Sequence, residues 1–142
     1  MLKGLNPLLG PELLKILRAM GHGDEIAIVD GNYPADTDAK RLVRMDGHSA
    51  TAVLDAILSV MPLDEMVPEA VFRPAAYLDP KRTEPVFQEF TKLVKKWDPK
   101  CHITVLVGAD FYNRVKGSYA IVATSEPRLY GNIVLRKGVI HP

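Results

Sequence analysis

Short runs of β-branched residues alternate along this chain with stretches of helical periodicity, and this alternation constrains its fold most. The runs with strand character are "EIAIV" at 25–29, "KRLVRMDG" at 40–47, "EAVFRPAAYL" at 69–78, "HITVLVG" at 102–108, "SYAIVATS" at 118–125 and "NIVLRKG" at 132–138. Strands that alternate with helices indicate helices layered on a sheet that is largely parallel or mixed. We therefore predict a single α/β domain over residues 1–142, with the central sheet flanked by helices.

Local signals predict where the helices begin and end. Ser49, Thr83 and Asp110 are expected to cap the starts of three helices, because their side-chain oxygens can accept from free backbone amides. Gly21 is expected to end the first helix in the left-handed conformation. Pro74 lacks an amide donor, which predicts that its strand is bulged or lies at an edge of the sheet.

Composition excludes several classes of partner. The net charge is only +1, and both signs are interleaved along the chain, so no basic field is present for nucleic acid or an anionic membrane. No apolar run approaches the roughly 18–20 residues that a membrane span needs. Cys101 is the only cysteine, which excludes an internal disulfide and indicates a reducing compartment. We expect a cytoplasmic protein.

Motifs for metals and common cofactors are missing. The four histidines have no ligand-like spacing. The chain also lacks a phosphate-binding loop, a dinucleotide fingerprint and a nucleophile elbow. We therefore expect no metal and no cofactor.

The segment "GHGDEIAIVDGNYP" at 21–34 holds the strongest chemical candidates. His22 lies between two glycines that allow close approach, and its imidazole can exchange protons near neutral pH. Asp30 follows the expected strand, at the end where ligands gather in open α/β sheets. Each residue has a purely structural alternative, a solvated turn for His22 and an Asp-Gly turn for Asp30.

Two later segments add polar groups. In "LYGN" at 129–132, Tyr130 and Asn132 supply a hydroxyl and an amide of the kind that orients a sugar, and the structural alternative is a simple turn. The segment "FYNR" at 111–114 mixes an aromatic core residue with polar groups, and its structural alternative is a short amphipathic helix.

Taken together, the chain resembles the family of L-fucose mutarotases and D-ribose pyranases, and is closer to the fucose branch. The matching stretches are "LLGPELLKILRAMGHGDEIAIVDGNYP", "VRMDG" and "FYNRVKGSYAIVATSEPRLYGNIVLRKGV", and the similarity is weakest from about residue 63 to 107. The resemblance implies an isomerase that needs no cofactor and interconverts the α and β anomers of L-fucose or a related monosaccharide by ring opening and closure. Two alternatives stay open: a D-ribose pyranase, and a non-catalytic monosaccharide-binding or transport-accessory protein.

The resemblance also implies roles for individual residues. His22 corresponds to the catalytic proton donor of the family and Asp30 to its sugar-binding aspartate. Tyr130, Gly131 and Asn132 correspond to its sugar-contacting segment. We expect His22 and Asp30 to face one shared cavity.

Two positions depart from the family pattern. Gly108 stands where relatives present a further sugar-contacting arginine or histidine, so that contact is either lost or supplied by a neighbour such as Arg114. Ser125 stands where the fucose group usually has glycine. The family assembles into rings, typically decamers with the sugar cleft near subunit contacts, which implies a homo-oligomer here.

Overall fold

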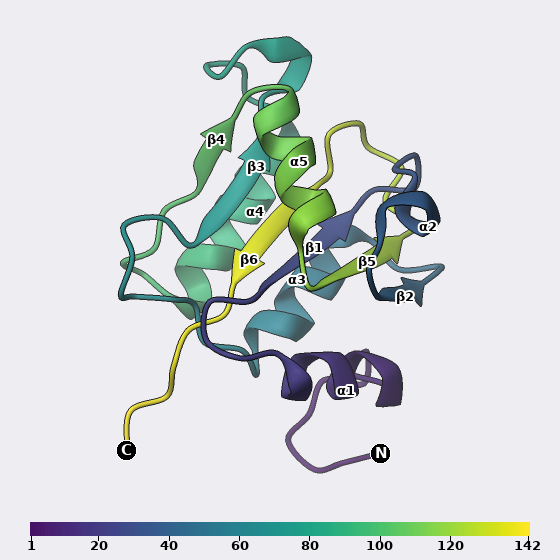
Figure 1. Cartoon of the computed structure of the whole chain (residues 1–142), viewed down its shortest axis with the longest axis vertical. Helices are drawn as coiled ribbons and strands as arrows, with labels where there is room; N and C mark the ends of the chain where they lie inside the picture. The colour runs from purple at the N-terminus through teal and green to yellow at the C-terminus, as the bar shows by residue number, and fades with distance from the viewer.

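The computed structural model describes residues 1–142 as one mixed sheet of six strands in the order β2-β5-β1-β6-β3-β4, with helices on both faces (Figure 1). The strands are β1 (Glu25–Val29), β2 (Leu42–Met45), β3 (Val71–Pro74), β4 (Thr104–Leu106), β5 (Ala120–Thr124) and β6 (Ile133–Arg136). The helices are α1 (Pro11–Ala19), α2 (Ala35–Asp38), α3 (Ala50–Leu58), the 3-10 turn η1 (Ala76–Leu78), α4 (Pro85–Trp97) and α5 (Ala109–Gly117). The predicted α/β class is confirmed.

Strand direction decides which residues meet at the ends of the sheet. β5 runs parallel to both β1 and β2, and β3 runs parallel to β4. β6 lies antiparallel to β1 and to β3, and so joins the two parallel groups. Because β6 runs against β1, it ends where β1 begins. The chain leaves the sheet on that side, toward its C-terminus (Figure 1).

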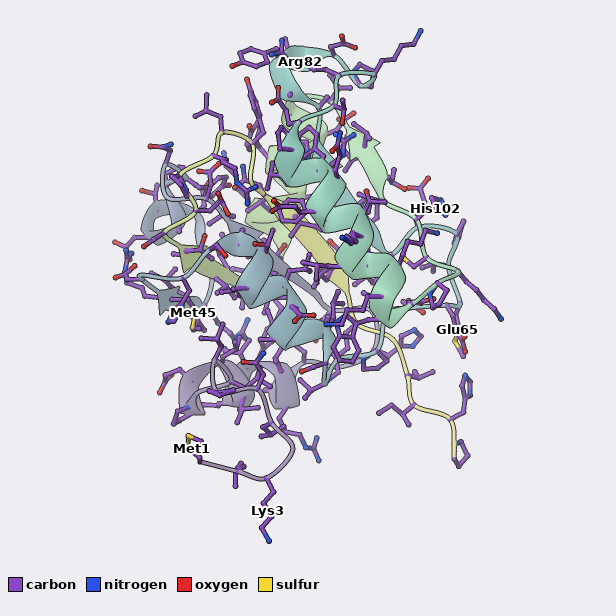
Figure 2. All side chains as sticks on the ribbon, turned by 180° about the vertical axis from the view of Figure 1, so that it is seen from behind. Met1, Lys3, Met45, Glu65, Arg82 and His102 are labelled. Carbon is purple, nitrogen blue, oxygen red and sulfur yellow. The ribbon has the colours of Figure 1, made fainter.

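The two faces of the sheet bury separate apolar clusters. Figure 2 shows α3 and α4 in front of the sheet, and together with α1 they cover the larger cluster. α5 crosses the opposite face (Figure 1) and buries Phe111 and Val115 against it. Within β1, Ile26 and Ile28 belong to the larger cluster, and Ala27 and Val29 belong to the smaller. This alternation is the period-2 geometry of a strand whose two faces are both covered.

The predicted cap at Ser49 is confirmed, and two other cap predictions are wrong. Ser49 Oγ accepts from the Ala52 amide at 3.2 Å. α4 begins after Glu84 rather than Thr83, since Pro85 occupies its first turn. At α5 the N-cap is Gly108, whose φ of +55° is open to glycine, and the predicted cap Asp110 lies inside the first turn.

The predictions for Gly21 and Pro74 are also wrong. α1 ends at Ala19 with its C-cap Met20 in extended backbone, and the left-handed residue is Gly23, with φ +87°, two positions after Gly21. β3 is an inner strand between β6 and β4. Pro74 is tolerated there because it is the last residue of the strand, where its missing amide interrupts no ladder.

None of the helices combines the length and the apolar character that a membrane span requires.

Candidate functional site

An open cavity of about 390 Å³ lies at the carboxyl end of β1. It brings together the predicted residues Asp30, Tyr130 and Asn132, although Asn132 lies 102 positions after Asp30. The remaining lining residues are Asn32, Tyr33, Pro34, Asp38, Tyr112, Lys116 and Leu129. Acidic, amide and phenolic groups therefore converge on one concave surface, the combination that recognises a small polyhydroxylated molecule.

Asp30 and Asn132 hold each other in a reciprocal contact. The Asp30 amide donates to Asn132 Oδ1 at 2.8 Å, and Asn132 Nδ2 donates to Asp30 Oδ2 at 3.1 Å. Asp30 Oδ1 accepts from the Asn32 amide at 2.9 Å, so the Asp-Gly turn expected as the structural alternative is also present. Both side chains are buried, and their orientation is set by these bonds before any ligand arrives.

Burial shifts the acid–base properties of the cavity. It raises the pKa of Asp30 above the usual aspartate value, although hydrogen bonds from Asn32 and Asn132 oppose the shift. It also raises the pKa of Tyr112, with the nearby Tyr130 and Asp30 adding to the effect. Tyr33 donates to Asp38 Oδ2 at 2.7 Å and stacks on Tyr112 with ring centroids 6.2 Å apart. Burial likewise raises the pKa of Tyr33, so the phenols of Tyr33 and Tyr112 stay protonated at neutral pH.

The Tyr130–Asn132 loop is held from behind by Glu126, a fully buried carboxylate. Glu126 accepts from the Ala50 amide at the start of α3 and from the Arg128 side chain, which donates from Nε at 2.8 Å. The loop is tight: Tyr130 has φ +63°, and a Cβ on Gly131 would lie 2.7 Å from Glu126 Cγ. Glycine at 131 is therefore required by space rather than by its backbone angles.

His22 lies at the other end of β1, in the turn between α1 and the strand. Its Nε2 is 3.1 Å from Asp64 Oδ1, and Asp64 Oδ2 accepts from Arg136 Nε at 2.8 Å. The His22 side chain is 42% exposed, whereas the Asp64 side chain is fully buried. The imidazole is thus oriented by a buried carboxylate and still reaches solvent.

Asp64 is a site residue that the sequence reasoning missed. Burial raises the pKa of its carboxyl, but hydrogen bonds from Arg136, the Met66 amide and His22 outweigh that effect, and the pKa lies below the usual value. Asp64 is therefore ionised at neutral pH. It follows an apolar run 42 positions after His22 and matches no motif, so only the fold brings the two together.

The expectation that His22 and Asp30 face one cavity within the chain is wrong. The five residues of β1 separate them, a span of about 16 Å at roughly 3.3 Å per residue. His22 does not line the Asp30 cavity.

Arg114, the predicted substitute for the sugar contact missing at Gly108, does not line the Asp30 cavity of its own chain. Its guanidinium is bound to Glu25, at 2.6 Å from Nη2 to Oε1, and lies over the Phe72 ring. Both contacts hold it away from the Asp30 cavity, at the end of β1 where the strand begins. The segment 111–114 lies within α5, as its structural alternative predicts.

No group of three or more histidine, cysteine, aspartate or glutamate side chains is placed to hold a metal ion.

Known proteins resemble this chain over nearly its whole length. The family model described as the RbsD / FucU transport protein family matches residues 3–140. The L-fucose mutarotase of Haemophilus influenzae is 39% identical over 98% of this chain and 97% of its own length. A fucose mutarotase from Streptococcus pneumoniae, solved in complex with L-fucose, is 40% identical, with a TM-score of 0.90 over 99% of this chain and all of its own.

A second solved structure marks the other branch of the family. Bacillus subtilis RbsD, complexed with D-ribose, superposes with a TM-score of 0.74 over 99% of this chain and all of its own, but at 23% identity it shares only the fold. The predicted nearness to the fucose branch is confirmed, and the chain belongs to the RbsD / FucU family.

Proposed function

We propose that this protein is a cofactor-independent sugar mutarotase, an isomerase that interconverts the α and β anomers of L-fucose or a related monosaccharide. The observation that carries the proposal is its full-length similarity to a fucose mutarotase solved with L-fucose. The alternatives, a D-ribose pyranase and a non-catalytic binding protein, are not favoured, since the curated relatives at 38–39% identity are named fucose mutarotases.

The Asp30 cavity is the proposed sugar-binding site. The Asp30 carboxylate accepts hydrogen bonds from two sugar hydroxyls, while Asn132 and Tyr130 offer an amide and a phenol. Because Asp30 and Asn132 are already held by each other, binding costs little side-chain ordering. Gly131 keeps the backbone between Tyr130 and Asn132 close to Glu126, which holds both side chains at the cavity wall.

Ring opening needs two proton transfers. The bond from the anomeric carbon to the ring oxygen breaks, its electron pair goes to the ring oxygen, and His22 delivers a proton there. The anomeric hydroxyl loses its proton to water or a second polar group as its oxygen becomes the aldehyde oxygen. Rotation about the bond beside the aldehyde carbon exposes the other face, and closure reverses both transfers. A positioned acid of this kind contributes about 10² to 10⁴ in rate.

We further propose that each reacting site combines two copies of the chain, with His22 from one copy facing the Asp30 cavity of the next. The separation of His22 from that cavity within one chain supports this arrangement. A head-to-tail contact of this type is heterologous, and closed rings are its finite outcome. We propose a closed ring, a decamer as the family resemblance implies. The lone Cys101 supports a cytoplasmic location.

Exposed apolar side chains accompany both halves of this composite site. Beside the cavity lies a group that we call the cavity patch, with Tyr77, Leu78, Val107 and Leu129 exposed by 55%, 69%, 40% and 55%. Tyr77 contacts Tyr130, and Leu78 lies 3.5 Å from where a Cβ on Gly108 would be. On the His22 side, Val60, Met66 and Ile140 are exposed. Two separate apolar patches on one chain support a head-to-tail contact.

Saturation-transfer NMR of anomer exchange tests the mutarotase. L-fucose, D-ribose and a panel of other monosaccharides are followed with native protein and with His22→Gln, and His102→Gln serves as the control because that exposed histidine lies outside the site. We expect accelerated exchange of L-fucose or a close relative that His22→Gln abolishes while weak binding remains. Exchange equal to the uncatalysed rate for every sugar would overturn the proposal.

Mixing two inactive variants tests the composite site. His22→Gln and Asp30→Asn each lack one half, and random co-assembly pairs an intact His22 with an intact cavity at about one contact in four. At a sugar concentration too low to saturate Asp30→Asn, we expect the mixture to recover about a quarter of native activity, whereas either variant alone stays far below that level. A mixture as inactive as its parts shows that both residues must belong to the same copy.

A further inference from the structure

An ion pair between the partly exposed Arg136 and the buried Asp64 lies directly behind the His22–Asp64 contact. Arg136, the last residue of β6, donates from Nε to Asp64 Oδ2 at 2.8 Å. Its backbone carbonyl accepts from the Asp64 amide at 3.1 Å, so Arg136 holds both the main chain and the carboxylate of Asp64. Asp64 Oδ1 is left to bind the imidazole and the Met66 amide.

Arg136 also packs against the turn that carries His22. Its Nη2 lies 3.0 Å from the position that a Cβ on Gly23 would take, so the guanidinium fills the space beside that glycine. The next residue of the chain closes the turn further: the Lys137 carbonyl accepts from the Gly23 amide at 2.9 Å. The end of β6 therefore holds the His22 turn in two ways. The Lys137 carbonyl binds the backbone of the turn, and Arg136 holds Asp64, which binds the imidazole.

The charges around Asp64 form a continuous series of alternating sign. Arg136 Nη1 lies 3.9 Å from Glu25 Oε1, and Glu25 in turn binds Arg114 at 2.6 Å. Asp64 is thus faced by His22 from the turn and by Arg136 from β6, with Glu25 of β1 and Arg114 of α5 behind them. Because the Asp64 side chain is fully buried, its negative charge depends on this guanidinium.

An ionised Asp64 determines which nitrogen of His22 is free. A carboxylate only accepts hydrogen bonds, so Nε2, at 3.1 Å from Oδ1, carries a hydrogen. The bond made by one ring nitrogen sets the role of the other. Nδ1 is then the nitrogen that exchanges a proton with a sugar: in the doubly protonated ring it carries the proton that goes to the ring oxygen, and in the neutral ring its lone pair takes that proton back on closure.

We propose that Arg136 is a positioning residue for the reaction: through Asp64 it fixes the orientation and the tautomer of His22, so that Nδ1 faces the substrate. This inference rests on the proposed function only where it concerns the effect of Arg136 on the rate of anomer exchange. The state of the imidazole itself is a property of the protein without sugar.

The test compares Arg136→Gln and Arg136→Lys with native protein. The control is Arg44→Gln, which removes an arginine paired with Asp46 on the surface. We expect Arg136→Gln to lower kcat by about 10²-fold with KM nearly unchanged, the effect of misplacing a reacting group by about 1 Å. The acidic limb of its pH–rate profile moves to higher pH by about one to three units, because Asp64 stays buried without its cation. Arg136→Lys restores part of the rate, since it keeps the charge but not the planar fork.

Nitrogen-15 NMR of the His22 imidazole, assigned with His22→Gln, separates this inference from the proposed function. Native protein should show a single tautomer protonated on Nε2, and both Arg136 variants should show a mixture. If native protein does not accelerate anomer exchange but the tautomer changes as expected, the mutarotase fails and the positioning role stands. A native tautomer and a native pH profile in both variants overturn the positioning role, and Arg136→Lys carries the test alone if Arg136→Gln does not fold.

Discussion

The two ends of β1 each hold a buried carboxylate paired with an arginine, but the two pairs support different kinds of group. Before the strand, Asp64 and Arg136 orient His22, whose side chain remains 42% exposed. Beyond the strand, Glu126 and Arg128 hold the loop beside Asp30, whose own side chain is buried.

The difference between the two ends follows from what each is proposed to do. The Asp30 end forms a concave surface of about 390 Å³ in which polar groups are fixed by mutual hydrogen bonds, and this suits recognition of a substrate. The His22 end offers one proton-carrying group that projects from the surface, and this suits delivery into a cavity formed elsewhere. In the proposed function, recognition and proton transfer are separated within one chain and are joined by assembly.

The largest effect is expected when the contact between copies is broken, because the His22 of one copy then no longer faces the Asp30 cavity of the next. Leu78→Asp places a carboxylate in the cavity patch, where burying it against a second copy would be costly. We expect the oligomer to dissociate and the rate of anomer exchange to fall by about 10² to 10⁴, to the level of His22→Gln. Analytical ultracentrifugation and saturation-transfer NMR measure the two results. Leu2→Asp, at an equally exposed leucine near the N-terminus, is the matched control, and a native size and rate in Leu78→Asp would contradict the composite site.

A smaller effect should be confined to the Asp30 end. Asp30→Asn keeps the size of the side chain but removes the charge that accepts sugar hydroxyls. We expect the affinity for L-fucose to fall by about 10- to 150-fold, the equivalent of about 1.5–3 kcal/mol for a hydrogen bond to a charged group. Calorimetric titration gives the affinity, and Asp36→Asn on the exposed side of α2 is the control. Unchanged affinity in Asp30→Asn would remove this cavity from sugar recognition.

The smallest expected effect is on the pH dependence of the melting temperature, through the ion pair between Glu126 and Arg128. A hydrogen bond from Arg128 lowers the pKa of Glu126 below its usual value despite burial. A depressed pKa contributes stability that is present above the unfolded value of about 4.3 and is lost as the pH falls through the folded value. The difference in melting temperature between native protein and Glu126→Gln should be constant above about pH 5 and should narrow below it.

Glu89→Gln is the matched control for that series. Glu89 also pairs with Arg128, at 2.9 Å, but it is half exposed, and exposed pairs contribute about 0–1 kcal/mol. Its melting temperature should stay near the native value at every pH. A difference for Glu126→Gln that does not change between pH 6 and pH 3 would show that Glu126 acts through packing alone.

Elements with a strong local pattern could be predicted from the sequence. β1 spans Glu25–Val29 as expected, since its apolar and β-branched residues suit a strand covered on both faces. The cap at Ser49 was equally local. At Thr83 and Asp110 the local signal was misleading, because Pro85 and Gly108 set the start of their helices instead.

The candidate site could be predicted only in part, because local patterns indicate residue types but not which distant residues meet. Asp30 and Asn132 were both singled out, and the fold brings them into contact. Asp64 was missed because a lone carboxylate after an apolar run has no signature. The prediction that His22 and Asp30 share a cavity within the chain is wrong because a strand between two residues holds them apart in space, however close they are in sequence.

The amino-acid sequence by itself determined the alternating strands and helices, the family, and the types of polar group available to a sugar, since these depend on local pattern and residue chemistry. Only the tertiary structure decided which groups meet. The antiparallel course of β6 carries Arg136 to the start of β1, where it binds Asp64, and Asn132 to the end of β1, where it binds Asp30. Strand order and direction are set by long-range packing, so the assignment of each residue to one end of the sheet could not be read from any short stretch of chain.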